Sequence, residues 1–208
     1  MLTMGEARLP ILLGLAVFVV LVFSGVAPYD RTTWLLEVAP VLIAVPVMVA
    51  TYRRFPLTEM LYIFIALHAL VLIEGGAYTY ARVPLGFWMQ DVLHLTRNPY
   101  DKIEHFMQGF VPALVAREIL LRGSYVTSRR MVAFLSICVA MAISAFYELI
   151  EWWTALALSM RADDFLGTQG DIWDTQSDMF MAMIGAIVAM VFFSKYHDKQ
   201  IATLNGTS

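Results

Sequence analysis

Carboxylates and a histidine recur at helical spacing in three segments of this 208-residue chain. The first segment carries four polar residues at relative positions zero, three, four and seven: Asp101, Glu104, His105 and Gln108. A helix would place these side chains on one face, because residues three, four and seven apart follow one another along it. Glu148 and Glu151 share a face of the second segment in the same way. The third segment opens with acids at spacings of three and four: Asp171, Asp174 and Asp178.

These residue types are those that bind divalent metal ions in proteins. Imidazole together with carboxylates suits Zn²⁺, Mn²⁺ or iron, whereas carboxylates alone suit Mg²⁺ or Ca²⁺. Because His105 lies among the acids, we expect a divalent metal ion here, with Zn, Mn or Fe favoured over Mg or Ca. The predicted ligands are Asp101, Glu104, His105, Glu148, Glu151, Asp171, Asp174 and Asp178. In an enzyme a metal-activated water would be the nucleophile and a carboxylate the base; the candidate catalytic residues are Glu148, Glu151 and Asp178.

Each part of this pattern also has a simpler interpretation. Asp101 could be a first-turn acid that favours the start of a helix, and Asp171 could be a helix cap. Some of the acids could be protonated, or could pair with Lys102, Arg97 or Arg161. Two further histidines are interpreted without a metal. His68 would hydrogen-bond a neighbouring helix, and His197 belongs to a basic tail.

The composition identifies the kind of protein that must position these residues. Hydrophobic residues make up 60% of the chain and charged residues only 15%, with a mean hydropathy of +0.69, so we expect a polytopic integral membrane protein. The 14 Lys and Arg residues against 17 Asp and Glu residues give no basic excess for binding nucleic acid. The single cysteine, Cys138, allows no disulfide within the chain.

The apolar segments predict an all-α bundle of about six transmembrane spans within a single membrane domain, residues 1–208. A spanning helix needs roughly 20 mainly apolar residues, and the segments that meet this length are 9–27, 33–51, 56–80, 101–121, 131–157 and 173–194. The first segment is interpreted as a retained helix, because its apolar run is long for a signal peptide. Between 81 and 100, a short interfacial helix and an irregular loop are both compatible with the sequence.

The distribution of basic residues predicts which side each end of the bundle faces. With six spans both termini share one side, which would carry Arg8, Arg53, Arg54, Arg117, Arg122, Arg129, Arg130, Lys195 and Lys199. The opposite side would carry Arg31, Arg82, Arg97, Lys102 and Arg161. Because basic residues favour the cytoplasmic side, we expect both termini in the cytoplasm. The acidic segments then all lie near the extracytoplasmic face, although the apolar runs that define the spans do not depend on them.

Three motifs resemble those of the YjdF-like bacterial inner-membrane proteins. They are PYDKIEHFMQGF at 99–110, AFYELIEW at 145–152 and GTQGDIWDTQSDM at 167–179. The resemblance covers most of the chain, from about the second span to the sixth. It implies a multi-pass protein of the bacterial inner membrane and leaves the activity open.

A more distant similarity is to VanZ-like membrane proteins. Asp101, Lys102 and His105 match the start of one helix in that group, and Glu148 and Asp174 match its later acids. Two positions depart from the pattern. Glu151 stands where that group usually has Gln, and Asp178 stands where it usually has Asn. Both departures add negative charge and favour a bound cation, and the similarity implies a role around the cell envelope or in the glycopeptide response.

These observations predict a membrane protein with a metal site near its outer face. Its chemistry could be metal-dependent hydrolysis of a lipid or a lipid-linked envelope molecule, and its partners are membrane lipids rather than nucleic acid. One alternative is a proton or cation transporter, since acids inside a membrane are typical of relays. Another is a non-catalytic protein in which the polar residues form a structural network. The sequence leaves the oligomeric state open.

Overall fold

The computed structural model describes residues 7–158 and 169–206, and every element in these two ranges is a helix. The helices are α1 Arg8–Val26, α2 Arg31–Thr51, α3 Glu59–Tyr78, α4 Pro84–Leu93, α5 Tyr100–Arg122, α6 Arg129–Leu158, α8 Asp174–Val188, the π turn η1 Ala189–Phe193 and α9 Ser194–Gly206. The all-α prediction is therefore confirmed for the described residues. Between the third and fourth predicted spans, α4 forms, so the helical alternative is the one that the structure adopts.

Length and composition identify five segments that could each cross a membrane. They are α1, α2, α3, residues Arg129–Ala157 of α6, and the continuous helical run Asp174–Leu204. A helix rises about 1.5 Å per residue, so about 20 residues are enough to cross the apolar layer. The 23-residue α5 is also long enough, but it carries more charged residues than this group. Its polar side chains are mostly buried against other helices.

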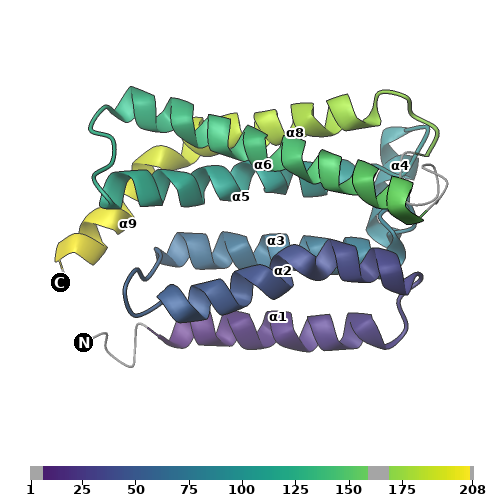
Figure 1. The fold of residues 1–208 in the computed structure, drawn as a ribbon, viewed down its shortest axis with the longest axis horizontal. Coiled ribbons are helices and arrows are strands. Elements are labelled where there is room, and N and C mark those ends of the chain that lie inside the picture. Colours follow the sequence, from purple (N-terminus) through teal and green to yellow (C-terminus); the bar gives the residue numbers. More distant parts are fainter. Residues whose placement is uncertain (1–6, 159–168, 207–208) are drawn as a thin grey trace.

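Helix α5 occupies the centre of the molecule. It packs against α3, α6 and α8, while α1 and α2 pack on the other sides of α3. Figure 1 shows α5, α6 and α8 on one side of the molecule and α1, α2 and α3 on the other. The start of α1 and the end of α9 lie at one end of the bundle, while α5 and α8 begin at the opposite end (Figure 1). We refer to this opposite end as the acidic end, because the described acids of the three predicted motifs lie towards it.

The contact between α5 and α8 depends on two glycines. A Cβ atom added at Gly109 would collide with the carbonyl oxygen of Ala182, and one added at Gly185 would collide with that of Phe106. Small residues let helix backbones approach closely in membrane proteins. The two helices that carry Asp101, His105 and Asp178 are thus held at backbone contact.

Replacing Gly109 by valine is expected to lower the free energy of unfolding by about 1–3 kcal/mol, because the added atoms force α5 and α8 apart. Thermal unfolding in detergent would measure the change. The matched control is Gly14→Val, since nothing lies within 4 Å of a Cβ at Gly14. Equal stability of the two variants would contradict the proposed close contact.

Candidate metal centre

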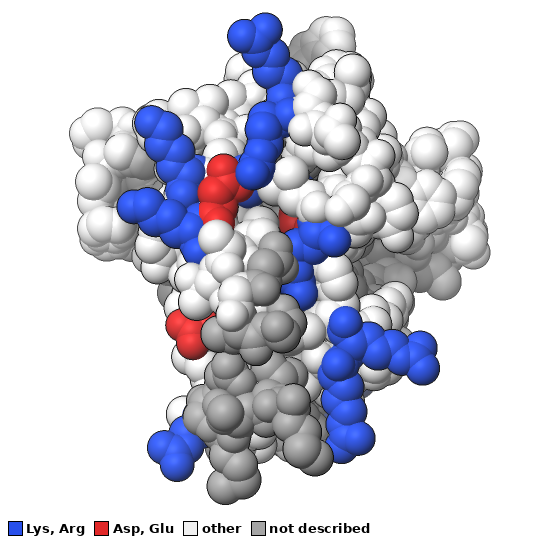
Figure 2. Space-filling view, turned by 90° about the vertical axis from the view of Figure 1, so that its left-hand side faces the viewer, with Lys and Arg blue, Asp and Glu red and all other residues white. Residues whose placement is uncertain are grey.

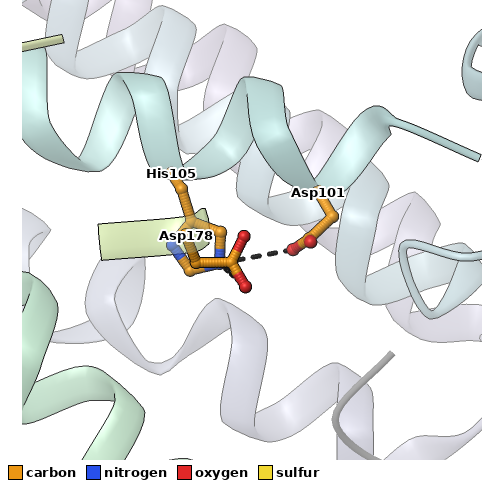
Figure 3. Close-up of side chains that lie close together, drawn as sticks. All are labelled: Asp101, His105 and Asp178. Carbon is orange, nitrogen blue, oxygen red and sulfur yellow. Dashed lines mark ion pairs between the residues drawn. The ribbon is translucent and has the colours of Figure 1, made fainter. Parts of the chain in front are cut away.

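Asp101, His105 and Asp178 bring three potential metal ligands together between α5 and α8 (Figure 3). The Nε2 atom of His105 lies 3.3 Å from Oδ1 of Asp101 and 3.7 Å from Oδ2 of Asp178. One ligand atom from each residue lies within 4.8 Å of the other two, and all three side chains are buried. Ligands that share one ion at about 2.0–2.3 Å lie about 3–4 Å apart. With small side-chain adjustments the three residues could therefore hold a single divalent ion.

Helical periodicity places these ligands on facing surfaces. Asp101 and His105 are one turn apart on α5 and point into the bundle, as the spacing of four predicts. Asp174 and Asp178 are likewise one turn apart on α8, and both are buried. The backbone contact between α5 and α8 then brings Asp178 opposite His105 (Figure 3).

The second nitrogen of His105 faces two glutamates. Nδ1 lies 3.4 Å from Oε2 of Glu104 and 4.0 Å from Oε1 of Glu148. When one imidazole nitrogen binds a metal, the other usually donates its hydrogen to a carboxylate, carbonyl or water. Glu104 and Glu148 are therefore placed to orient the ring, while its Nε2 atom faces the aspartates.

Several buried polar atoms near this centre have no hydrogen-bond partner in the described structure. They are Nδ1 of His105, Oε1 of Glu148, Oε1 of Gln108, Oγ of Ser144 and the hydroxyl of Tyr80. Buried polar atoms in proteins nearly always have a partner, which can be water or an ion. His105 and Gln108 are each only 4% exposed, and Glu148 only 8%. Such a group of unpaired atoms favours a bound ion or water at the centre.

Two cations of the chain also contact the carboxylates. Nζ of Lys102 lies 3.2 Å from Asp101, 3.0 Å from Asp174 and in close contact with Asp178. Nη2 of Arg97 lies 2.6 Å from Asp174 and 3.2 Å from Asp171. Partial burial would lower the pKa of Arg97, but its hydrogen bond and attraction to Asp174 raise the pKa above its ordinary value. Both cations offset part of the negative charge at this end.

Other helices add acids around the metal centre. Glu104 on α5 lies 3.4 Å from Nε2 of His68 on α3, which is the contact with a neighbouring helix that the sequence predicted for His68. Glu37 on α2 is buried and accepts a hydrogen bond of 3.1 Å from the hydroxyl of Tyr147 on α6. These contacts join the α1–α3 side of the bundle to the α5–α8 side.

Glu151 and Asp171 are not among the acids that form ion pairs with His105 in the described structure. Asp171 pairs with Arg97, and its Oδ1 accepts a hydrogen bond of 2.9 Å from the backbone N–H of Trp173. Asp171 thus makes a local turn contact before α8 but is not its cap, since the N-cap position is Trp173. Glu151 is partly buried one turn beyond Glu148 and forms no ion pair with the described residues. Arg161, a predicted partner of the acids, lies outside the described residues.

The structure contains a second buried polar cluster that the sequence analysis missed. Glu118, which is fully buried, accepts a hydrogen bond of 2.8 Å from the hydroxyl of Thr58 and forms an ion pair of 2.7 Å with Arg122. Its Oε2 atom also lies 2.8 Å from Nε2 of His197, which is fully buried too. The interpretation of His197 as part of a basic tail is therefore wrong.

The π turn explains why His197 faces the bundle. His197 follows Asp178 by 19 positions, and at about 100° per residue an unbroken α-helix would turn it about 100° away from the buried face. A single-turn π-bulge takes up one extra residue. The turn at Ala189–Phe193 therefore restores the register and returns His197 to the side that faces α5.

Comparison with known proteins gives one family and one relative. The family model described as "Predicted membrane protein (DUF2238)" matches residues 9–199. The inner membrane protein YjdF of Escherichia coli (strain K12) is 59% identical over 187 residues, which cover 90% of this chain and 90% of that protein. No solved structure matches the chain significantly.

Proposed function

Because this chain belongs to the DUF2238 family of predicted membrane proteins, we propose a function for it within the inner membrane: a divalent-metal-dependent hydrolase that acts on a lipid or a lipid-linked envelope molecule. The resemblance to YjdF-like proteins, predicted from three sequence motifs, is confirmed, as is the inner-membrane location. The buried group of Asp101, His105 and Asp178, with unpaired polar atoms beside it, carries the proposal.

The proposed topology has six spans with both termini in the cytoplasm. Five helical segments qualify as spans by composition, and we propose α5 as the sixth. It is long enough to cross the membrane and is surrounded by other helices. The end opposite the metal centre carries most of the basic residues, and Figure 2 shows Lys and Arg side chains spread over it. Basic residues favour the cytoplasmic side, so the metal centre would lie near the extracytoplasmic face.

The ligand set favours Zn²⁺, Mn²⁺ or iron over Mg²⁺ and Ca²⁺. A histidine nitrogen is a ligand that the first three ions accept readily, whereas Mg²⁺ and Ca²⁺ prefer oxygen atoms alone. In the proposed arrangement Asp101, His105 and Asp178 hold the ion, which supplies Lewis-acid activation of a water molecule. Glu104 and Glu148 lie beside the other nitrogen of the ring, where either could accept its hydrogen once the ion is bound.

We assign Glu148 to handle the proton of the reaction. Its Oε1 atom is buried, has no hydrogen-bond partner and lies 4.0 Å from His105. A carboxylate in this position can accept the proton that a nucleophilic water loses and return it to the leaving group. Asp178 would then act mainly as a ligand, while Glu151, one turn beyond Glu148, would add negative charge behind it.

The surroundings of the metal centre suit an amphipathic substrate. Exposed tryptophans occur on α4, near the end of α6 and just before α8: Trp88, Trp152, Trp153 and Trp173. Such side chains are enriched at membrane–water interfaces. α4 itself exposes Leu85, Phe87 and Val92. A substrate with acyl or prenyl chains could remain in the lipid while its polar group reaches the acids.

A structural role is the second candidate, and the contacts of Lys102 favour it. Its ammonium group bridges three aspartates without any added ion. The transport alternative has less support. A cluster of aromatic rings formed by Phe64, Phe110 and Phe193 fills the interior between the metal centre and the Glu118 cluster. It interrupts a continuous polar path through the bundle.

Elemental analysis of protein purified without added metal or a histidine tag tests the proposal. We expect about one equivalent of Zn, Mn or Fe in the unaltered protein and almost none in His105→Ala, because the imidazole is a proposed ligand. The control is His94→Ala, which changes an exposed histidine outside the centre and should retain the ion. Circular dichroism would establish that both variants are folded.

The metal-loaded protein would then be assayed against phospholipids and lipid-linked phosphates in mixed micelles. Hydrolysis that requires both the ion and Glu148 would support the proposed metal-dependent hydrolase. Absence of metal, with affinity for divalent ions no tighter than millimolar, would overturn the metal proposal. Bound metal with full activity in Glu148→Gln would overturn the role of Glu148.

A further inference from the structure

The end of the bundle opposite the metal centre is strongly basic, and we call it the basic end. Its described Lys and Arg residues are Arg8, Arg53, Arg54, Arg117, Arg122, Arg129, Arg130, Lys195 and Lys199. Its described acids are Glu59, Glu118 and Asp198. Figure 2 views this end and shows blue side chains around a few red ones. The excess of positive charge attracts anions to this face.

Within the basic end, two guanidinium groups share one carboxylate oxygen. Nη2 of Arg117 on α5 lies 2.6 Å from Oδ1 of Asp198 on α9. Nη1 of Arg129, at the start of α6, lies 2.8 Å from the same oxygen. Two positive charges therefore face a single negative charge where three helices meet. The Glu118 cluster does not supply the missing charge, because Glu118 is paired with Arg122 and His197.

Arg117 has hydrogen-bonding capacity that the described structure does not use. The residue is only 4% exposed, and its Nη1 atom has no hydrogen-bond partner among the described residues. A buried arginine in a membrane helix is costly and usually has a partner. A guanidinium presents its N–H groups as a planar fork that matches the oxygens of phosphate.

Arg129 and Asp198 are accessible from the surface of the molecule, whereas Arg117 is buried behind them. The side chain of Arg129 is 64% exposed and that of Asp198 is 39% exposed. Arg117 thus forms the inner wall of the site, while Arg129 forms its outer wall. A group with several oxygens could bridge the two guanidiniums beside Asp198 or in its place.

We propose that Arg117 and Arg129 form a binding site for a phosphate group at the basic end. The phosphate could belong to the headgroup of an anionic phospholipid, since basic pockets between transmembrane helices bind such headgroups. It could also be a soluble phosphate, which has the same chemistry. The site is separate from the metal centre, so its test does not depend on the proposed hydrolase.

Native mass spectrometry of the full chain in neutral detergent tests the site by titration with phosphatidylglycerol or phosphatidylcholine. We expect preferential binding of one phosphatidylglycerol, weakened about tenfold in Arg129→Gln because one charge-assisted contact is lost. Arg130→Gln removes the same charge from the next residue, which is exposed, and should change the affinity less than about twofold. Both residues are exposed, so neither change should disturb folding.

Asp198→Asn gives a test of opposite sign. Removing the competing carboxylate should strengthen phosphatidylglycerol binding more than Glu59→Gln, which removes an exposed negative charge at the same end. Displacement of the lipid by millimolar inorganic phosphate would support a site for soluble phosphate, and retention of the lipid would support a headgroup site. Equal effects of Arg129→Gln and Arg130→Gln, or equal binding of the two lipids, would overturn the proposal.

Discussion

Asp178→Asn is expected to weaken Zn²⁺ or Mn²⁺ binding by more than about 100-fold. Loss of an outer partner of a metal ligand already costs roughly 10–100-fold in affinity, and Asp178 is proposed to contact the ion itself. Asparagine keeps the volume of the side chain but removes its charge. Competition with a fluorescent chelator, using purified protein in detergent at neutral pH, would measure the dissociation constant.

Lys102→Met should change the same affinity in the opposite direction. The ammonium group of Lys102 contacts Asp101 and Asp178, two of the three proposed ligands. It therefore repels a divalent cation at the centre and competes for the same oxygens. Its removal should tighten metal binding by about tenfold or more, since a change of about 1.4 kcal/mol in the free energy of binding corresponds to a factor of ten in affinity.

Asp171→Asn is the matched control for these two variants. It removes one negative charge near the same end, but Asp171 contacts Arg97 and the backbone before α8 rather than His105. Its effect on metal affinity should stay within about threefold, as expected for a partly exposed and screened charge. If Asp171→Asn and Asp178→Asn weaken binding equally, the ion is held by general negative charge and not by the triad.

Lys102→Met also distinguishes a metal centre from a purely structural network. In a structural network, Lys102 is the cation that holds Asp101, Asp174 and Asp178 together. Replacing it would leave the buried carboxylates of Asp101 and Asp178 without their lysine partner and lower the stability of the protein. A Lys102→Met variant that unfolds more easily, and that gains no stability from added metal, would therefore favour the structural interpretation.

The general location of the metal centre could be predicted from the sequence because the spacing of the acids and the apolar residues around them indicate the same buried helix faces. Acids at spacings of three and four define one face of a helix, and apolar residues around them indicate a buried position. The order of the spans then predicts which helix ends lie together. Asp101, Glu104 and His105 illustrate this, since all three are buried on one face of α5.

Which of the seven predicted acidic ligands lie beside His105 depended on contacts that spacing does not encode. Asp178 reaches His105 because Gly109 and Gly185 let α5 and α8 touch. Glu148 faces His105, whereas Glu151, on the same side of α6 by spacing, makes no ion pair with the described residues. Such differences arise from how far each helix is rotated and translated against its neighbours.

The Glu118 cluster was missed for a physical reason as well. His197 lies in a polar stretch near the C-terminus, and an unbroken helix would turn it away from α5. The π turn that corrects the register has no clear signal in the sequence AMVFF. Glu118 stands out as an acid near the end of an apolar segment, next to Arg117, but nothing in the sequence indicates its partner on α9.

Glu118→Ala is expected to lower the free energy of unfolding by about 3–5 kcal/mol. Removing one partner of a buried ion pair leaves the other charge buried and unpaired. Here the loss would affect Arg122, Thr58 and His197 together, which come from α5, the start of α3 and α9. Unfolding in mixed micelles with increasing sodium dodecyl sulfate would measure the change.

Two comparisons make this prediction specific. Glu59→Ala removes an exposed acid at the same end and should cost less than about 0.5 kcal/mol. In the double variant Glu118→Ala, Arg122→Met, the unpaired guanidinium is removed as well, so the loss of stability should be smaller than the sum of the two single losses. Metal affinity should remain unchanged in the folded variant, because Glu104 and Glu118 lie about 20 Å apart along α5. Strict additivity, or a cost no greater than that of Glu59→Ala, would mean that the pair does not hold α3, α5 and α9 together.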